Sequence, residues 1–425
     1  MPFQHRLRWA IIGLIGLATI VNYIDRTSLA VMWPAISRDT GLSKDAYASI
    51  IAVFMVCYAL GQAVSGRLFD RVGTRIGFVL SITVWSAACG LHAAARSVLS
   101  LSLVRGLLGF SEAGNWPGAT KAVAEWFPRH ERALAQGVFN AGASVGAVVS
   151  APIIATLYLW FGWRATFLVV AALGFLWLIP WLWIARSTPA QHPWITARER
   201  EHILDGAAPA ANAGQPGMRW REALAFRQTW AVVVSRFFLD PIWWLFVNWL
   251  PIYLADRFGF DVKQIGMFAW VPYLGAAAGS LGGGWYSGHK IQQGWSVDRA
   301  RKRAILIGGA MTIPGFGLAA IAGSPWAAVI AMALVLAGFQ VMINNIQTLP
   351  SDFFAGKSVG TVAGIGGLSA VAGVLVFSTW LVPVLTRISY VPVFLLGAAL
   401  VPLAIGSVYF FSGEIRRVDV AADVR

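Results

Sequence analysis

Four ionisable side chains lie in stretches of sequence that are otherwise apolar enough to cross a bilayer. Asp25 and Arg26 interrupt the first such stretch, and Arg105 and Glu112 lie two helical turns apart in the fourth. A charge at the centre of a membrane helix costs roughly 2.5–3.5 kcal/mol, so these groups persist where they face one another or a water-filled cavity. Two acids and two arginines inside a membrane predict a site that binds an anion and handles protons.

Polar side chains recur at helical spacing in other apolar stretches, so each set shares one helix face. Asn22 joins Asp25 and Arg26 in this way. The further sets are Tyr58 and Gln62; Gln136, Asn140 and Ser144; and Gln340, Asn344 and Gln347. Because lipid does not tolerate such stripes, we expect them to face inward around a polar cavity. Arginines suit a carboxylate and amides suit hydroxyl groups, so the predicted ligand is a sugar acid.

The composition is that of a membrane protein. The chain has 425 residues, of which 57% are hydrophobic and 12% are charged, whereas soluble domains carry about 25% charged residues. Twelve stretches are long enough to cross the bilayer, which needs about 20 apolar residues. They are 9–31, 46–66, 75–95, 98–119, 134–158, 163–186, 230–254, 264–286, 303–322, 325–346, 360–384 and 391–411. We therefore expect an all-α membrane protein, with no disulfide and no cleaved signal peptide.

A polar stretch divides these spans into two six-helix halves. Residues 187–228 are predicted to be a cytoplasmic linker between an N-terminal half, 1–186, and a C-terminal half, 229–425. Lysines and arginines are concentrated in the loops on the linker's side, which predicts that both termini are cytoplasmic in a multi-pass protein of the inner membrane. The net charge of +14 then faces anionic lipid, and no nucleic-acid partner is needed to explain it.

The loop after the second span carries the run from Gly66 to Arg75, with Asp70, Arg71 and Gly73 between them. This run resembles the G-x-L-x-D-R-x-G-R-[RK] motif of the major facilitator superfamily, whose fold has two six-helix halves. The glycines permit a tight turn, and Asp70 can cap a helix N-terminus or pair with an arginine. These five residues are the expected inner-loop gating motif.

Further segments resemble the anion:cation symporter family, and within it the hexuronate transporters. They are 22–26, 105–112, 125–132, 139–146 and 239–244. The resemblance implies that Asp25 and Glu112 handle protons, that Arg26 contacts the substrate carboxylate and that Tyr58 contacts substrate. Together with the polar stripes, it gives a set of expected substrate-binding residues. These are Arg26, Tyr58, Arg105, Asn22, Gln62, Asn140, Gln340 and Asn344.

The expected function is proton-coupled import of a sugar acid by alternating access. With both acids ionised, Asp25, Glu112, Arg26 and Arg105 sum to zero, so a monoanionic substrate adds one negative charge that a proton would neutralise. Substrate binding to Arg26 should weaken the hold of this arginine on Asp25 and so favour protonation of Asp25. Arg105 has an alternative role, as a buried ion pair that only holds helices together.

The span-ten segment departs from the pattern of many hexuronate transporters. Phe339 and Met342 stand where these relatives show histidine and tryptophan, so the substrate could be a hexuronate such as glucuronate or galacturonate, an aldonate, an aldarate or another small organic anion. In span seven, Arg236 and Asp240 are four residues apart, which favours a structural or gating pair over a substrate contact.

Other functional classes have weaker support in the sequence. A proton-coupled drug antiporter would share the fold but usually carries a Gly-Pro motif in span five, which is absent here. A non-transporting sensor would need a signalling domain. An enzyme would need a nucleophile–base set or a metal motif. We expect no cofactor and no metal, and a functional monomer whose partners are the substrate, protons and lipid.

Overall fold

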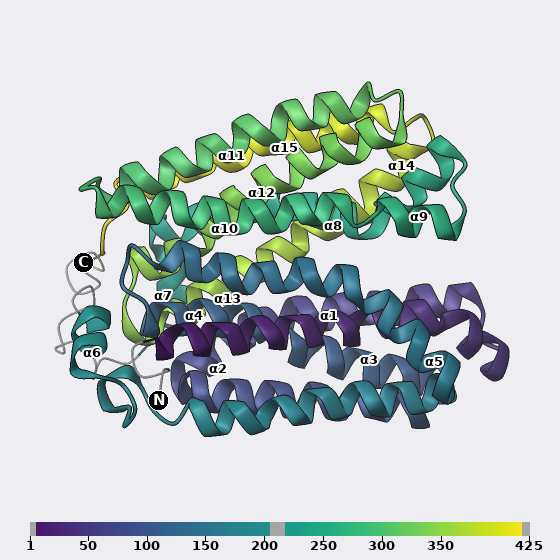
Figure 1. Ribbon diagram of the computed structural model, residues 1–425, viewed down its shortest axis with the longest axis horizontal. Coiled ribbons are helices and arrows are strands. Elements are labelled where there is room, and N and C mark those ends of the chain that lie inside the picture. The colour runs from purple at the N-terminus through teal and green to yellow at the C-terminus, as the bar shows by residue number, and fades with distance from the viewer. Residues whose placement is uncertain (1–5, 205–216, 419–425) are drawn as a thin grey trace.

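The computed structural model describes residues 6–204 and 217–418, and the described helices form two bundles that lie side by side (Figure 1). The N-terminal bundle contains α1 (Leu7–Thr40), α2 (Lys44–Leu91), α3 (Val98–Glu112), α4 (Asn115–Trp126) and α5 (Arg132–Ile184). The C-terminal bundle contains α8 (Arg227–Phe258), α9 (Val262–Phe268), α10 (Val271–Gln292), α11 (Val297–Ala320), α12 (Pro325–Phe353), α13 (Val359–Gly373), the π-helix η5 (Val374–Leu381), α14 (Val382–Thr386) and α15 (Val391–Ser412). Between them lie α6 (Ala197–Leu204) and α7 (Trp220–Ala225), and residues 205–216 of the expected linker are outside the described part.

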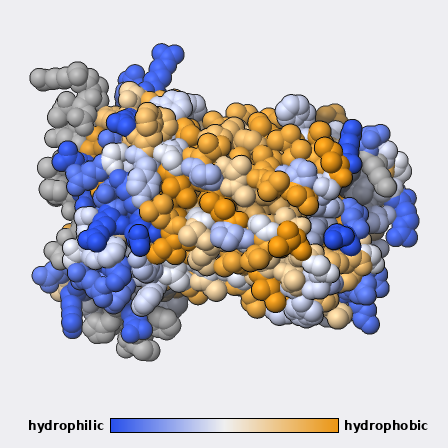
Figure 2. Space-filling view, turned by 90° about the horizontal axis from the view of Figure 1, so that it is seen from above, coloured by the Kyte–Doolittle hydropathy of each residue, from blue (hydrophilic) through white to orange (hydrophobic). Residues whose placement is uncertain are grey.

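The twelve expected crossings correspond to fewer helices because several turns keep helical hydrogen bonding. Within the described residues, nine helices are long and apolar enough to cross a membrane. Two of them, α2 and α5, each contain two crossings joined at a glycine with positive φ, Gly73 (79°) and Gly162 (73°). The remaining crossing is interrupted between Glu112 and Asn115, which separates α3 from α4. A broad apolar belt lies between polar ends on the outer surface (Figure 2).

The two bundles are held together at one end, which we call the linker end because α6, Leu7 of α1 and the end of the described C-terminus lie there (Figure 1). Asp70, at the linker end of α2, accepts hydrogen bonds from the backbone amides of Gly360 and Thr361 (3.0 and 2.6 Å) and from the Thr361 hydroxyl (2.7 Å). Lys121 forms an ion pair with Asp70 (3.2 Å) and donates to the Gly356 carbonyl. The carboxylate therefore caps the N-terminus of α13 across the interface.

A second set of contacts closes the same end between α5 and the C-terminal bundle. Arg132 donates to the Ser351 carbonyl (2.8 Å), and Arg301 pairs with Asp352 (3.0 Å) while donating to the Arg129 carbonyl (2.9 Å). These arginines are buried. Burial makes such charge-assisted bonds costly to break singly, so the described conformation is closed at the linker end.

The linker helix α6 is bound to the N-terminal bundle by a compact ionic network. Arg8 binds Glu131 through two nitrogens (2.7 and 3.0 Å) and Glu199 of α6 through a third (2.9 Å). His202 of α6 also contacts Glu131 (3.0 Å). Donor atoms of His130, Glu131 and His202 come within 4.8 Å of one another, but Arg8 already occupies both Glu131 oxygens, so ion pairing explains this cluster.

Replacing Asp70 with asparagine should open the linker end. The variant loses the ion pair with Lys121 and at least one of the three charge-assisted hydrogen bonds, each contributing about 1.5–3 kcal/mol, so the open population should rise at least about tenfold. Distances between spin labels at Arg6 and Gln293 would report the change, with Asp45→Asn at the opposite end as the control. An unchanged distance distribution in Asp70→Asn would contradict this role.

Replacing Glu131 with glutamine should release α6. Burial opposes ionisation of Glu131, but hydrogen bonds from Arg8 and His202 outweigh it and hold the pKa of this carboxyl below its ordinary value of 4.5. The network therefore stabilises the protein above that value and is lost as pH falls through the lower, folded-state pKa. Intrinsic-rate-corrected hydrogen exchange of α6 should accelerate about tenfold in Glu131→Gln at neutral pH, and in the wild type only at acidic pH. Glu201→Gln, in the same helix, should leave exchange unchanged.

Candidate functional site

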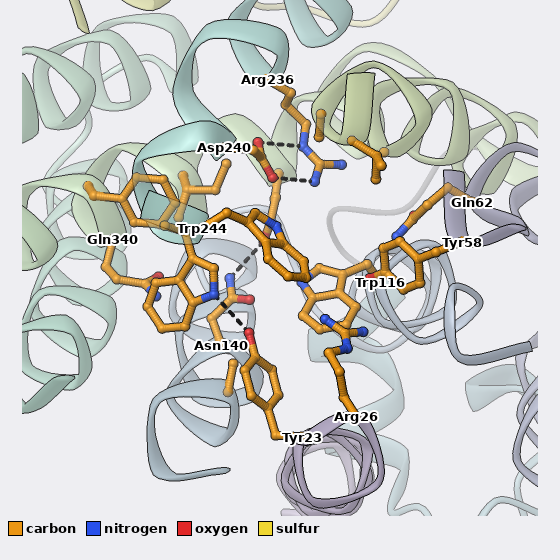
Figure 3. A pocket seen from close by; sticks show the side chains of 18 residues that line it. Tyr23, Arg26, Tyr58, Gln62, Trp116, Asn140, Arg236, Asp240, Trp244 and Gln340 are labelled. Atoms are coloured by element: carbon orange, nitrogen blue, oxygen red, sulfur yellow. Dashed lines mark hydrogen bonds and ion pairs between the residues drawn. The ribbon is translucent and has the colours of Figure 1, made fainter. Parts of the chain in front are cut away.

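A cavity lies between the two bundles, and six helices of the N- and C-terminal halves supply its polar side chains (Figure 3). The described lining residues are Tyr23, Arg26, Tyr58, Gln62, Trp116, Asn140, Ala143, Arg236, Asp240, Trp243, Trp244, Phe339, Gln340, Ile343, Gln347, Gly367, Ala370 and Val371. The structure thus brings together Arg26, Tyr58, Gln62, Asn140 and Gln340 of the expected binding set. The remaining members, Asn22, Arg105 and Asn344, lie behind the wall.

Arg26 is the cationic centre of the cavity. Its Nε and Nη2 atoms donate to Oε2 of Glu112 (3.3 and 3.2 Å), and Nη2 also donates to Asn22 (3.1 Å). Among the described residues, Nη1 donates no hydrogen bond, and the Tyr58 side chain lies beside the guanidinium. The hydrogen-bonded carboxylate comes from α3, whereas the sequence analysis considered only the hold of Arg26 on Asp25, the adjacent residue, which points in a different direction.

Aromatic rings surround the Arg26 guanidinium. Its central carbon lies 4.7 Å from the ring centre of Tyr58, 5.4 Å from Trp244 and 5.8 Å from Trp116. Tyr58 in turn stacks on Phe54 at 5.7 Å. Such faces stabilise a cation without neutralising it, so Arg26 keeps its charge available for an anion.

Arg105 is a positioning residue in this structure. It is 2% exposed, and its Nη2 donates to the backbone carbonyl of Arg26 (2.6 Å). The central carbon of its guanidinium lies 4.7 Å from the ring centre of Phe54. Arg26 lies against the rings of both Tyr58 and Phe54, and Arg105 lies against Phe54. Arg105 is not among the residues that line the cavity, so this geometry does not support the expected direct contact between Arg105 and substrate.

The two acids occupy different surroundings. Glu112 is fully buried and gives one oxygen to Arg26, while its Oε1 has no hydrogen-bond partner within the described chain. Asp25 is also fully buried, and neither of its oxygens accepts a hydrogen bond from a nitrogen or oxygen donor of the described residues; the Cys89 thiol adjoins it. Burying an unpaired carboxylate is expensive in the charged form, so both acids are placed where gaining a proton relieves a cost.

The opposite wall carries the C-terminal half's polar groups. Arg236 binds Asp240 through Nε and Nη2 (3.2 and 2.9 Å), and both side chains face the cavity from α8 (Figure 3). Trp243 donates to the Tyr23 hydroxyl (2.8 Å) and stacks on Phe339. Of the two departures in span ten, Phe339 lines the cavity, whereas Met342 is fully buried elsewhere.

Asn140 links the cavity floor to α12. Its amide donates to Asn344 and to Gln347 (2.7 Å each), and Asn344 donates to the Ser280 carbonyl (2.8 Å). Asn344 is thereby occupied in joining α10, α5 and α12. Its expected substrate contact is replaced by this structural network.

The inner-loop motif lies at the linker end, away from the cavity. Gly73 makes the turn, Arg71 and Arg75 are exposed, and a side chain on Gly66 would collide with the Gly360 carbonyl. This close approach of α2 and α13 is what allows Asp70 to reach the amides of α13. Gating by the five residues of this motif remains a proposal.

Sequence reasoning missed several lining residues, and Tyr23 and Trp116 are the most informative of them. Tyr23 precedes Arg26 by three positions and Trp116 follows Glu112 by four, so helical spacing placed both on the polar faces. Aromatic residues at such spacing from a buried arginine were the available signal.

The amino-acid sequence is similar to those of known proteins. Residues 15–378 match the model of the Major Facilitator Superfamily. The chain belongs to the major facilitator superfamily. It is 33% identical over 393 residues to the hexuronate transporter of Escherichia coli K12, with 91% of this chain and 90% of that protein covered. It is 33% identical over 325 residues to the galacturonate transporter of Dickeya chrysanthemi, with coverages of 76% and 94%.

Solved structures of the superfamily have the same fold. The structure of the proton:xylose symporter XylE superimposes with a TM-score of 0.72 at 15% identity, covering 97% of each chain. Membership of the superfamily makes this protein a membrane transporter rather than an enzyme, as the sequence predicted.

Replacing Arg26 with lysine should remove anion binding. Lysine retains charge but lacks the planar fork that holds Glu112 and Asn22 while presenting another N–H. We expect at least about a tenfold weaker affinity for an anionic ligand, measured by quenching of tryptophan fluorescence, since Trp116 and Trp244 adjoin the site. Arg164→Lys, at an exposed ion pair with Asp39, is the matched control. Equal affinity of Arg26→Lys and wild type would contradict the assignment.

Proposed function

We propose that this protein is a proton-coupled symporter that imports a sugar acid across the inner membrane by alternating access. The observation that carries the proposal is the state of Arg26: a cavity-lining guanidinium held by a single buried carboxylate, with Nη1 left for an anion. A substrate carboxylate can bind such a fork through two parallel hydrogen bonds. The hexuronate and galacturonate transporters named above support a sugar acid as that anion.

Coupling to protons follows from competition for Arg26. Glu112 and a substrate carboxylate would both be acceptors for the same guanidinium. When substrate binds, Glu112 loses its partner in a fully buried position, and a proton on Glu112 removes the cost of an unpaired buried charge. Asp25, one residue before Arg26 and without a nitrogen or oxygen donor among the described residues, is the second proposed proton site.

Alternating access requires the linker end to open and close. We propose that the linker end is cytoplasmic, since the loops there carry most of the lysines and arginines. The described conformation would then be closed to the cytoplasm. Proton and substrate loading would be followed by release of Asp70 from the N-terminus of α13, with Gly66, Arg71, Gly73 and Arg75 forming the turn around this latch. One chain contains the whole cavity, which supports a functional monomer.

The test is uptake of labelled glucuronate into proteoliposomes with an imposed inward proton gradient. A gradient of about one pH unit supplies about 1.4 kcal/mol per proton, so each coupled proton can raise accumulation about tenfold. The wild type should accumulate substrate, and Asp25→Asn and Glu112→Gln should lose gradient-driven accumulation. Asp45→Asn, an exposed acid outside the cavity, is the control.

Two results would overturn the proposal. Accumulation by Asp25→Asn at the wild-type level would remove Asp25 from coupling. Uptake by the wild type that ignores the proton gradient would remove proton coupling itself and leave a facilitated sugar-acid carrier.

A further inference from the structure

We infer that Arg236 and Asp240 form a second pole of the cavity that binds the hydroxyl end of the substrate, so that the transporter selects acids with one carboxylate over dicarboxylates. This inference rests on the proposed function and deepens it. It assigns to these residues a specificity role in place of the structural or gating role that their spacing alone favoured.

The pair faces the cavity rather than only bracing its own helix. Its side chains are 7% and 15% exposed, and both line the cavity across from Arg26 (Figure 3). A pair that only stabilised α8 could lie on any buried face.

Each arginine is bound by a carboxylate through two hydrogen bonds, but the two carboxylates use their oxygens differently. Glu112 accepts both bonds from Arg26 at Oε2 and leaves Oε1 to accept a proton, whereas Asp240 uses both of its oxygens on Arg236. Among the described lining residues, the charged side chains are Arg26, Arg236 and Asp240. Only the Arg26 pole can therefore become a net cation toward the substrate, and it accommodates one carboxylate.

The paired groups suit hydroxyls instead. Asp240 has lone pairs beyond the two that Arg236 uses, and Arg236 has an Nη1 group with no acceptor among the described residues, so a hydroxyl can donate to one and accept from the other. Gln340 adds an amide on the same side, and its Oε1 has no partner in the described part of the chain. A second carboxylate at this place would meet Asp240, and like charges side by side are strongly disfavoured.

Gluconate and glucarate provide a matched pair of probes, since they differ only by a terminal hydroxymethyl group in place of a carboxylate. We would measure inhibition of labelled glucuronate uptake by each acid in proteoliposomes. In the wild type, gluconate should inhibit at concentrations at least about tenfold lower than glucarate does.

Asp240→Asn removes the repelling charge and leaves Arg236 as a cation, so the ratio of half-inhibitory concentrations, glucarate over gluconate, should fall at least about tenfold. The double variant Arg236→Gln/Asp240→Asn has no charge at this pole, and its ratio should lie between the two. It also decides the question if the single variant does not fold, because it buries no unpaired arginine. Asp256→Asn, in an exposed part of the same helix, should keep the wild-type ratio.

The outcomes separate this inference from the proposed function. If no sugar acid is taken up by the wild type, both fail. If glucuronate is accumulated but glucarate inhibits as well as gluconate, or if the ratio is unchanged in both Asp240 variants, only the second pole is overturned.

Discussion

The cost of burying charge between apolar helices governs this structure. Every ionisable group near the cavity has either a partner, an aromatic face or an oxygen left to accept a proton. Arg26 is paired with Glu112, lies against the ring of Tyr58 and lines the cavity. Removing any of these would leave a charge whose burial the remaining contacts do not offset. A buried charge in this site can therefore leave its partner only if another partner or a proton replaces that partner. A coupled carrier requires this linked exchange.

The same constraint explains the linker end. Asp70, Lys121, Arg132, Arg301 and Asp352 are nearly inaccessible to solvent, yet they lie at the interface that must separate. Each carboxylate is bound by backbone amides or arginines, so the interface is specific without a large apolar surface. Polar contacts of this kind can be rehydrated when the bundles part, which an apolar seam could not be at equal cost.

Much of the fold and part of the site could be predicted from the sequence. Hydrophobic stretches of about 20 residues located all twelve crossings, because lipid allows few other patterns. Arg26, Tyr58, Gln62, Asn140 and Gln340 were found because a polar residue in such a stretch needs an inward face. Helical spacing could not reveal which residue of another helix each one meets. For this reason Arg105 and Asn344 were expected in the cavity although they bind backbone and amides behind it, and Glu112 was not foreseen as the hydrogen-bond partner of Arg26.

One feature of α2 links the binding cavity to the interface that must open. Tyr58 and Gln62 line the cavity and Asp70 caps α13, all on one uninterrupted helix, so the distance from Tyr58 to Asp70 is about 18 Å at 1.5 Å per residue. Helix α13 follows the same course, since a side chain on Gly367 would collide with Gln62 while Gly360 binds Asp70. The two helices are therefore in contact both beside the cavity and at the closed end. A tilt of either helix beside the ligand would displace its other end as well, and with it the contact between Asp70 and α13.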